Sequence, residues 1–438
     1  MKLTFNNIGT RYKRMFLSAG ISLLAKVATV SFFFISSPIV LEHVGIELFG
    51  IWLFINTFSL IMAFSDFGIG NGLVNKLGVV IANKNDKQIA ILISSCFFMV
   101  VLFSVVIFGA ISYFIYNTNI CQLVGSNSCN SGDDIRNGFI IFILLLFITS
   151  FGAIAQKVHI AQQNHYRNSL VLIVGNVLSI IFFLLPQIPK ETLVWIIVLS
   201  SGPVAILTAV NAISFFIFEQ KYLRPRFSSF DINISVKLLR EGVVFFVLSI
   251  LAFFLFSGDS FFVGIIFGAT QLAIFGAIAR LTNGFLIFQH IAIPNWAAFN
   301  DALAQGDKKW ARHAFKKMLF ISFSTSMVSA LILLFFGQEI ITLWLGSSLL
   351  PDQSLLIAFA CWLVLANLGS IIGSIMNSKV FLRRQFNFYF VTVAIAIVGK
   401  MMAAHYEILS LITYSTVVAY LFLYLLPSFL IITKELKE

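Results

Sequence analysis

Charged residues are scarce in this chain of 438 residues. Asp, Glu, Lys and Arg together make up 11% of it, whereas 59% of its residues are hydrophobic and 50 of them are Phe. A soluble globular protein carries roughly 25% charged residues. The chain therefore has too little charge to cover the surface of a soluble protein of this length, and its apolar excess predicts that it lies in a lipid bilayer.

Motifs for nucleotide and metal chemistry are also missing. No G-x-x-x-x-G-K-[ST] loop occurs, because the only Gly-Lys pair, Gly399-Lys400, is followed by Met401. No H-E-x-x-H or Cys-x-x-Cys motif indicates a metal site. We therefore expect no cofactor, no metal and no ATP hydrolysis by the chain itself. Cys121 and Cys129 share one predicted outer loop, and the sequence leaves open whether an oxidising periplasm joins them.

Long apolar runs dominate the rest of the sequence. A helix needs about 20 apolar residues to cross the hydrocarbon core, and runs such as 140–147 do not alternate as the strands of a membrane barrel do. The fold class is thus an all-α polytopic membrane protein. The first run is expected to be retained, since it is longer than a signal-peptide core. The breaks between runs predict twelve transmembrane helices, namely Phe16–Ser37, Leu48–Phe67, Ile89–Tyr116, Gly138–Gln156, Ser169–Leu185, Leu193–Phe218, Gly242–Phe262, Leu272–Ala292, Met318–Gly337, Leu355–Met376, Phe386–Ala404 and Ile408–Ile432.

Lysine and arginine are distributed unevenly over the predicted loops. With the N-terminus in the cytoplasm, 24 of the 29 fall in cytoplasmic segments, and only Arg136 and Lys190 fall in outer loops. Because positive residues favour the cytoplasmic side of a membrane, we expect both termini in the cytoplasm. The net charge of +11 then reflects this topology, and no nucleic-acid partner is expected.

A basic linker at residues 219–241 divides the chain into two halves of six predicted helices. The N-terminal half covers residues 1–218 and the C-terminal half covers residues 242–438. Because six is even, both halves would start in the cytoplasm, and any repeat would be parallel, related by an axis along the membrane normal. Short polar turns at residues 82–87 and 304–308 precede corresponding helices and favour such a repeat.

Three cations lie inside predicted spans. Lys26 is ten residues into the first helix, Arg280 is eight residues into the eighth, and Lys400 lies near the outer end of the eleventh. An ionisable group within the bilayer costs about 2.5–3.5 kcal/mol and almost always faces a bundle interior or a watery cavity. A cavity for an anionic substrate is the simplest use of that cost. We therefore predict that Lys26, Arg280 and Lys400 bind substrate.

Two carboxylates lie near the ends of predicted spans. Asp66 is at the inner end of the second helix and Asp259 at the outer end of the seventh, and we interpret both as gating or coupling residues. Two alternatives stay open. Asp259 and Arg280 could form a pair that only locks two helices together, and Lys400 could be a lysine whose long side chain reaches the membrane interface.

Several short motifs resemble one transporter family. The segment Asp66-Phe67-Gly68-Ile69-Gly70-Asn71 resembles the D-hydrophobic-G-hydrophobic-G-N signature of polysaccharide repeat-unit flippases. These are the Wzx-type O-antigen transporters of the multidrug/oligosaccharidyl-lipid/polysaccharide (MOP) exporter superfamily. Ser257-Gly258-Asp259 with Gly264 and Gly268, and the segment 340–346, are similar to later parts of the same family. The likeness in layout covers essentially the whole chain.

The resemblance implies a fold and a substrate. The fold would be two six-helix lobes (MATE/MOP-like) in a V shape around a central cationic cavity. The substrate would be an undecaprenyl-pyrophosphate-linked oligosaccharide, moved from the cytoplasmic to the periplasmic leaflet of the bacterial inner membrane. The resemblance also implies that Asp259, Arg280 and Lys400 are functional charges, and less directly Lys26. Inner-membrane lipids, the O-antigen polymerase and a chain-length regulator are the partners it suggests.

Two other functions remain to be weighed. A drug or metabolite antiporter of the MATE type shares the superfamily, but a cation exporter should place carboxylates in the membrane rather than Lys26 and Arg280. An O-antigen polymerase would be a membrane enzyme acting on the same lipid, and it would need a large periplasmic loop with catalytic residues. The outer loops contain only two basic residues. We therefore expect a transporter rather than an enzyme, driven by an ion gradient or the membrane potential.

Overall fold

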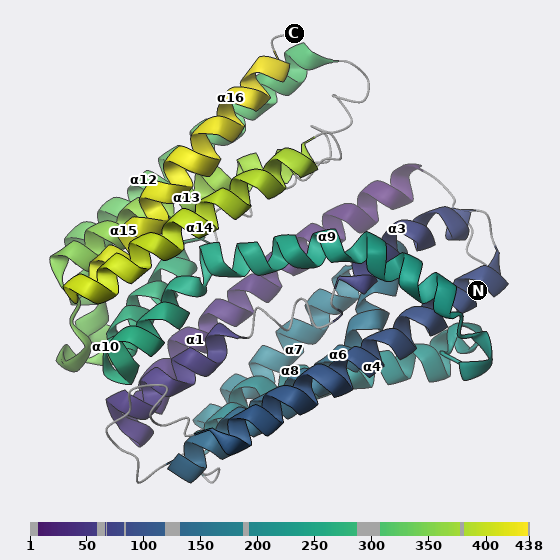
Figure 1. Cartoon of the computed structure of the whole chain (residues 1–438), viewed down its shortest axis with the longest axis horizontal. Helices are drawn as coiled ribbons and strands as arrows, with labels where there is room; N and C mark the ends of the chain where they lie inside the picture. The colour runs from purple at the N-terminus through teal and green to yellow at the C-terminus, as the bar shows by residue number, and fades with distance from the viewer. Residues whose placement is uncertain are drawn as a thin grey trace. The chain divides into compact units, whose positions relative to one another are not determined.

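The chain folds as a set of long helices. A computed structural model describes residues 8–58, 66, 68–82, 85–118, 132–186, 192–286, 307–376 and 381–436. Within these residues all regular structure is helical, and eleven helices are long and apolar enough to cross a membrane. Figure 1 shows the helices in chain order. The predicted class, an all-α polytopic membrane protein, is confirmed.

Most predicted spans coincide with helices of the structure. Spans three to six correspond to α4, α6, α7 and α8, and the last four correspond to α12, α13, α14 and the continuous run α15–η7–α16. α12 extends well beyond its predicted span at both ends. The bounds are α1 (Ile8–Thr57), α3 (Ile69–Ala82), α4 (Asp86–Asn117), α6 (Gly132–Ala161), α7 (Tyr166–Leu184), α8 (Leu193–Ser214), η2 (Phe215–Glu219), η3 (Lys221–Leu223), η4 (Phe227–Ser229), α9 (Ile232–Phe256), α10 (Gly258–Phe285), α12 (Lys308–Leu345), η6 (Ser347–Leu349), α13 (Gln353–Met376), α14 (Leu382–Tyr406), α15 (Leu409–Ala419), η7 (Tyr420–Leu425) and α16 (Leu426–Glu435).

The predicted gap between the first two spans is wrong. The sequence placed a loop at residues 38–47, but α1 continues through Pro38 and breaks only at Gly45, where φ is 76° and ψ is 178°. Residues that carry a Cβ atom disfavour this backbone conformation, so the glycine permits the sharp kink. A short helix then runs to Thr57. Residues 59–65 and 67 of the second predicted span lie outside the described residues.

The predicted boundary between spans seven and eight is also wrong. α9 begins at Ile232, within the predicted linker, and ends at Phe256, whereas the seventh span was expected to reach Phe262. α10 starts at Gly258 and kinks at Gly268, with φ 80° and ψ 178°. The break at residues 257–258 lies inside an apolar run, so an average of hydropathy over the run does not detect it. The kinks at Gly45 and Gly268 have nearly the same backbone angles, which adds a second likeness between the two halves.

The chain divides into two compact units. Unit 1 contains Met1–Leu48 and Phe58–Ile250, and unit 2 contains Phe49–Thr57 and Leu251–Glu438. The segment Phe49–Thr57, which the sequence placed in the N-terminal half, thus packs within unit 2. The core of unit 1 brings together buried side chains of α3, α4, α6, η2 and α9, and Cys96 lies within it. The described part of each unit has its own buried apolar core.

Close helix packing in unit 2 depends on glycine. A Cβ at Gly50 would lie 1.9 Å from the carbonyl oxygen of Ala269, and a Cβ at Gly276 would lie 2.6 Å from a methyl carbon of Leu53. At Gly50 the segment Phe49–Thr57 therefore packs backbone to backbone against α10, and its Leu53 side chain packs directly on the α10 backbone at Gly276. This contact fixes the position of Trp52, which is fully buried.

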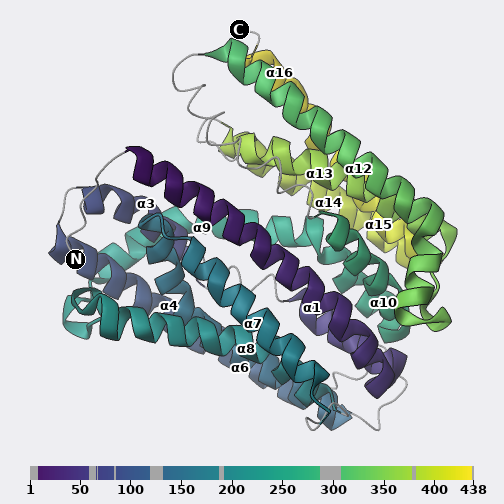
Figure 2. The same cartoon turned by 180° about the vertical axis from the view of Figure 1, so that it is seen from behind.

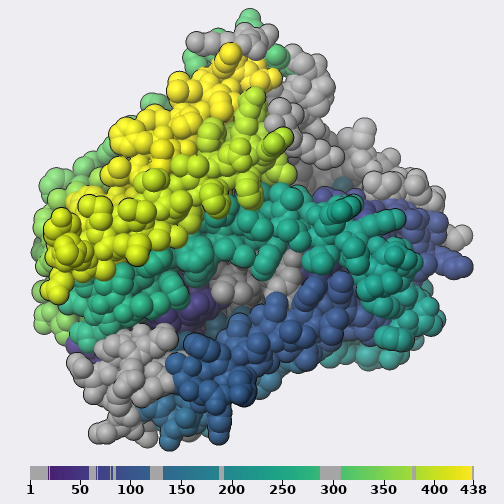
Figure 3. Space-filling view, viewed as in Figure 1, coloured from purple at the N-terminus to yellow at the C-terminus, as the bar shows by residue number. Residues whose placement is uncertain are grey.

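The outer surface of α14, α15, η7 and α16 is apolar. α14 lies beside the continuous run α15–η7–α16 in unit 2, as their contacts show, and Figure 3 shows the surface of this run in yellow. They expose large side chains that a soluble protein would bury, including Phe390, Val398, Met401, Phe422 and Leu430. Such a surface is suited to contact with lipid acyl chains. The chain is therefore a multi-pass membrane protein.

Candidate functional site

Lys26 lies on α1, between two contacts that hold α1 against α7. Figure 2 shows the ribbons of these two helices. The hydroxyls of Ser22 and Ser169 are 3.0 Å apart, and the Asn176 side-chain amide donates to the Thr29 hydroxyl at 3.0 Å. Ser22 is four residues before Lys26 and Thr29 is three residues after it, so all three share one side of α1. The two contacts thus fix the helix that carries the Lys26 ammonium. Hydrogen bonds between helices explain Asn176 without a role in binding.

No carboxylate neutralises Lys26 among the residues that the structure describes. The five ion pairs of that part of the chain involve other cations. Its side chain is half-buried on a helix long and apolar enough to span the membrane. A cation held in the membrane without a counter-ion is suited to bind an anion transiently.

Asp66 sits in a polar cluster at the start of α3. Its Oδ2 lies 3.0 Å from the Lys157 ammonium, which also donates to Asn71 Oδ1 at 2.7 Å. Its Oδ1 accepts from the backbone N–H of Gly68 at 3.1 Å. Lys157, which the sequence placed in a cytoplasmic loop, instead belongs to α6 and is mostly buried. Asp66 therefore ties α3 to α6, and its predicted gating role stays a prediction.

The glycines of the Asp66–Asn71 motif are explained by this packing. Gly68 has a positive φ of 75°, and a Cβ there would lie 2.4 Å from the carbonyl oxygen of Gly242 on α9. A Cβ at Gly70 would lie 2.1 Å from Asp66 Oδ2 and 2.8 Å from Lys157 Cγ. The motif thus combines a charge pair with two positions that lack room for a side chain. Its spacing serves local structure in unit 1.

Gly68→Ala is expected to destabilise the protein by about 2 kcal/mol or more, because it combines a strained backbone conformation with a clash against α9. The measurement is thermal unfolding in detergent. The matched control is Gly78→Ala on α3, the helix that follows Gly68, where a Cβ would meet nothing within 4 Å. The control should be neutral or slightly stabilising, since Ala favours a helix over Gly. Equal unfolding temperatures for the two variants would contradict this packing.

Asp66→Asn should lower stability by about 1–3 kcal/mol, because it removes the charge that neutralises the mostly buried Lys157 ammonium. The side chain keeps its size and can still accept from the Gly68 N–H, so the loss reports the ion pair. Denaturation of the purified chain measures it. Lys76→Gln, which breaks a more exposed pair with Glu241 at 3.1 Å, is the control and should change stability little. If both variants lost the same stability, burial of the Asp66–Lys157 pair would not increase its contribution.

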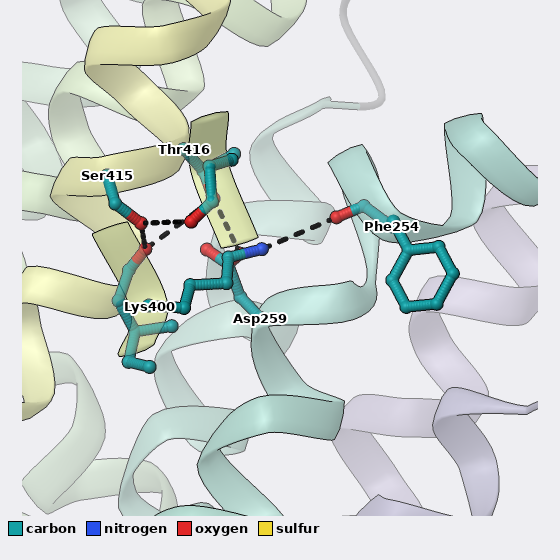
Figure 4. Close-up of polar contacts among 7 residues, drawn as sticks. Phe254, Asp259, Lys400, Ser415 and Thr416 are labelled. Carbon is teal, nitrogen blue, oxygen red and sulfur yellow. Dashed lines mark hydrogen bonds and ion pairs between the residues drawn. The ribbon is translucent and has the colours of Figure 1, made fainter. Parts of the chain in front are cut away.

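Asp259 and Lys400 form a buried ion pair in unit 2. The Lys400 ammonium lies 2.8 Å from Asp259 Oδ1 and 3.5 Å from the Phe254 carbonyl oxygen, and it faces the Phe262 ring at 5.1 Å. The Thr416 hydroxyl donates to the same Asp259 oxygen at 2.7 Å. Figure 4 shows Lys400 between Asp259 and the Phe254 carbonyl. The pair connects the start of α10 with α14 and α15.

This pair decides two alternatives that the sequence left open. Asp259 pairs with Lys400, and the ion pairs of the described residues do not include one between Asp259 and Arg280. The interpretation of Lys400 as a lysine that reaches the interface is wrong, because its side chain is only 1% exposed. The long side chain turns inward because a carboxylate and a carbonyl solvate its ammonium there. Whether Lys400 or Asp259 also takes part in transport stays a prediction.

Arg280 lies against aromatic rings in unit 2. Its guanidinium carbon is 4.1 Å from the centre of the Trp52 ring and 6.0 Å from that of Phe49. A cation over an aromatic face gains about 0.5–2 kcal/mol, more when water is excluded. The kink at Gly45 and the crossing at Gly50 bring Trp52 to this place. The predicted role of Arg280 in substrate binding is compatible with this contact and stays a prediction.

Several partners in these clusters were not found from the sequence. Lys157, Thr416 and Trp52 contact the predicted charges, yet each is remote in the chain from the residue it contacts. The position of Lys157 directly after a predicted span was the one available signal. Cys121, Cys129 and Lys190 lie outside the described residues, as do residues 304–306 of the polar turn predicted before the ninth span. Among the described residues no cluster of His, Cys, Asp or Glu is suited to hold a metal.

Solved membrane transporters share this fold. No protein-family profile and no curated protein matches the sequence. A structure described as the inward-facing conformation of a multidrug resistance MATE family transporter of the MOP superfamily is 14% identical, with a TM-score of 0.73 over 95% of this chain and 99% of that chain. The outward-facing conformation of such a transporter is 15% identical, with a TM-score of 0.64 over 98% and 97%.

A third solved structure of this fold comes from Pyrococcus furiosus. It is a MOP superfamily transporter whose binding pocket has reverse polarity, which suggests a different function for it. It is 15% identical to this chain, with a TM-score of 0.67 over 98% of this chain and 97% of that one. At such identities the likeness establishes the fold. The chain has the fold of the MATE transporters of the MOP superfamily over nearly its whole length.

Proposed function

We propose that this chain is a flippase for an anionic, lipid-linked saccharide. It moves an undecaprenyl-pyrophosphate-linked repeat unit, such as that of O-antigen, from the cytoplasmic to the periplasmic leaflet of the bacterial inner membrane. The observation that carries the proposal is Lys26, a half-buried cation on a membrane-spanning helix with no carboxylate partner among the described residues. Lys157 and Lys400, in contrast, are each matched by a carboxylate.

The chemistry of the substrate explains why such a cation is needed. A saccharide with a pyrophosphate cannot cross hydrocarbon unaided, because its hydroxyls and charges would lose their water without replacement. An ammonium at the depth of Lys26 replaces part of that hydration for the phosphates. An apolar tail can meanwhile stay in the lipid beside the exposed apolar side chains of α1, such as Leu24.

The fold supports movement by alternating access. Proteins of this fold have been solved in inward-facing and outward-facing conformations. With cytoplasmic termini, as the charge distribution predicts, export of negative charge is favoured by an inside-negative potential, by about 2.3 kcal/mol per charge for each 100 mV. The reverse polarity described for the Pyrococcus furiosus pocket supports the idea that this fold accommodates substrates of different charge.

A MATE-like antiporter of small molecules is the second candidate. Multidrug transporters share the fold, so the fold supports this function equally. One observation favours it, namely that the Asp259 side chain keeps 16% exposure and is a carboxylate that a cationic drug would need. Asp259 is already paired with Lys400, however, and Lys26 would repel a cationic substrate. A polymerase is not supported, because the solved proteins of this fold are described as transporters.

A deletion strain separates these functions. Without a flippase, lipid-linked single repeat units should accumulate in the cytoplasmic leaflet, and surface polysaccharide should disappear. Without a polymerase, single units would instead reach the periplasmic leaflet and the cell surface. Without a drug antiporter, polysaccharide would be normal and sensitivity to cationic compounds would rise. Either of the last two results would overturn the proposal.

A further inference from the structure

A row of buried polar side chains runs along one face of α15, η7 and α16. Thr416, Tyr420, Tyr424 and Ser428 follow one another at four-residue intervals, and each is 0% exposed. Residues four apart on a helix share a face, so the four side chains form one stripe. We call this stripe the polar row. A polar stripe in the core of a membrane-spanning unit is costly and indicates a function.

Several polar atoms along the row are not satisfied by the protein. Within the described part of the chain, the hydroxyls of Tyr420 and Ser428 have no hydrogen-bond partner, whereas the Tyr424 hydroxyl interacts with the side chains of Tyr389 and Gln385 on α14. Each belongs to a residue that is at most 2% exposed. Buried polar atoms in native proteins are almost always hydrogen-bonded, and ordered water is their usual partner where side chains do not reach.

The local backbone makes room for these hydroxyls. Tyr420–Leu425 is π-helical, a rare conformation that is frequent at functional sites. On the facing helix α13, a Cβ at Gly369 would lie 2.0 Å from the Tyr420 hydroxyl, and a Cβ at Gly373 would lie 3.2 Å from that of Tyr424. The two glycines are one helical turn, about 6 Å, apart. A single water that makes two hydrogen bonds of about 2.8 Å spans such a gap.

A third tyrosine, Tyr389 on α14, lies beside the polar row. The rings of Tyr389 and Tyr424 have their centres 4.6 Å apart, and those of Tyr420 and Tyr424 lie 5.0 Å apart. A Cβ at Gly373 would also lie 3.9 Å from the Tyr389 hydroxyl. Gln385 precedes Tyr389 by four residues and shares its face. The hydroxyls therefore gather at the backbone of α13.

The polar row ends at a carboxylate. Thr416, its first member, donates to Asp259 Oδ1, and the same oxygen accepts from the Lys400 ammonium. Lys400 on α14 is the only charged group that contacts Asp259 among the residues described, and the Phe254 carbonyl at the end of α9 accepts from the same Lys400 ammonium. Asp259 is 16% exposed at its side chain. It is thus reached from the surface of unit 2 and from the row.

We propose that the polar row, with ordered water between its hydroxyls, conducts protons to Asp259. In this step the Thr416 hydroxyl gives its proton to the Asp259 carboxylate and takes one from a hydronium in the row, which becomes water, so the ion pair with Lys400 becomes a neutral acid beside a cation. The released Lys400 charge weakens the connection between α10 and α14. When Asp259 gives the proton to water at its exposed side, the pair forms again. The coupling of this step to export rests on the proposed function.

The hydration of the row is tested by radical footprinting of the whole chain in lipid nanodiscs. Radicals formed from bound water oxidise side chains beside that water even when they are fully buried. After correction for intrinsic reactivity, Tyr420 and Tyr424 should be oxidised at least tenfold faster than Phe275 and Phe315, which are buried at 1% exposure among apolar neighbours. Equal rates would show a dry core and overturn the proposal.

Proton conduction is tested in proteoliposomes that contain a pH-sensitive dye. Tyr424→Phe and Tyr420→Phe each remove one hydroxyl and keep the ring, and each should lower proton uptake at least tenfold. Tyr406→Phe, at a tyrosine of α14 that is 60% exposed, is the matched control and should conduct as the native chain does. Native uptake in both row variants, or none in the native chain, would overturn the proposal. Headgroup movement down a substrate gradient, read in the same vesicles, tests the proposed function separately.

Discussion

Lys26→Ala is expected to lower the supply of surface polysaccharide at least tenfold in cells that depend on this chain. The substitution removes the ammonium that meets the phosphates but leaves the contacts Ser22–Ser169 and Asn176–Thr29 that hold α1 to α7. A tenfold loss corresponds to about 1.4 kcal/mol of lost interaction, a modest value for a charge-assisted contact with a phosphate. Polysaccharide at the cell surface is measured against the amount of protein in the membrane.

Two control variants separate charge from structure at this position. Lys26→Arg keeps the positive charge and should retain most of the function. Asn176→Ala removes the contact with Thr29 and should lower the unfolding temperature, but it leaves the Lys26 charge in place. Wild-type polysaccharide with Lys26→Ala, at equal protein level, would show that this ammonium does not serve the substrate.

Asp259→Ala should destabilise the folded chain by about 3–5 kcal/mol. It leaves the Lys400 ammonium, only 1% exposed, without a counter-ion in the core of unit 2, and breaking a buried pair from one side is strongly unfavourable. The double variant Asp259→Ala with Lys400→Met should recover most of that loss, because an apolar replacement of a whole buried pair is often neutral. Thermal unfolding of the purified variants in detergent measures both.

A third variant controls for general disturbance of the site. Thr416→Val removes one hydrogen bond to Asp259 and should cost only about 1 kcal/mol, so it serves as the control for general disturbance of the site. If Asp259→Ala and Thr416→Val were equally stable, or if the double variant were less stable than the single one, the buried pair would not hold α10 to α14 as its geometry indicates.

Much of the fold follows from composition, since apolar runs of about 20 residues have few alternatives to a membrane helix. The runs that became α4, α7, α8 and α13 were found with boundaries close to those of the structure. The kinks at Gly45 and Gly268 were not found. A single glycine that takes a positive φ changes the direction of a helix without changing its mean hydropathy.

The charges of the candidate site were found, but most of their partners were not. Asp259 and Lys400 are 141 residues apart, and burial of the pair depends on how α10, α14 and α15 pack. A local pattern contains no information about such contacts. It therefore identified Lys400 as a charge in the membrane but left open where its side chain points. Asp66 was likewise identified without its partner Lys157, because the start of α6 and its length beyond residue 156 were unknown.

Glycine spacing in the Asp66–Asn71 motif shows how a resemblance and a structural reason can coincide. The motif suggested a family, and the structure explains its residues by a close approach of α3 to α9 and by an ion pair with α6. These contacts lie within unit 1 and involve no substrate. The motif therefore supports the fold more directly than it supports the cargo.

The most direct test of the account is transbilayer movement of a labelled lipid headgroup by the purified chain. Vesicles are prepared with undecaprenyl-pyrophosphate-linked oligosaccharide, and an enzyme added outside reports how much of it reaches the outer leaflet. The account predicts that the native chain moves the headgroup, that Lys26→Ala moves it at least tenfold more slowly, and that Lys26→Arg restores movement. A native chain that moves none of this lipid, or moves it equally well without the Lys26 ammonium, would contradict the central claim.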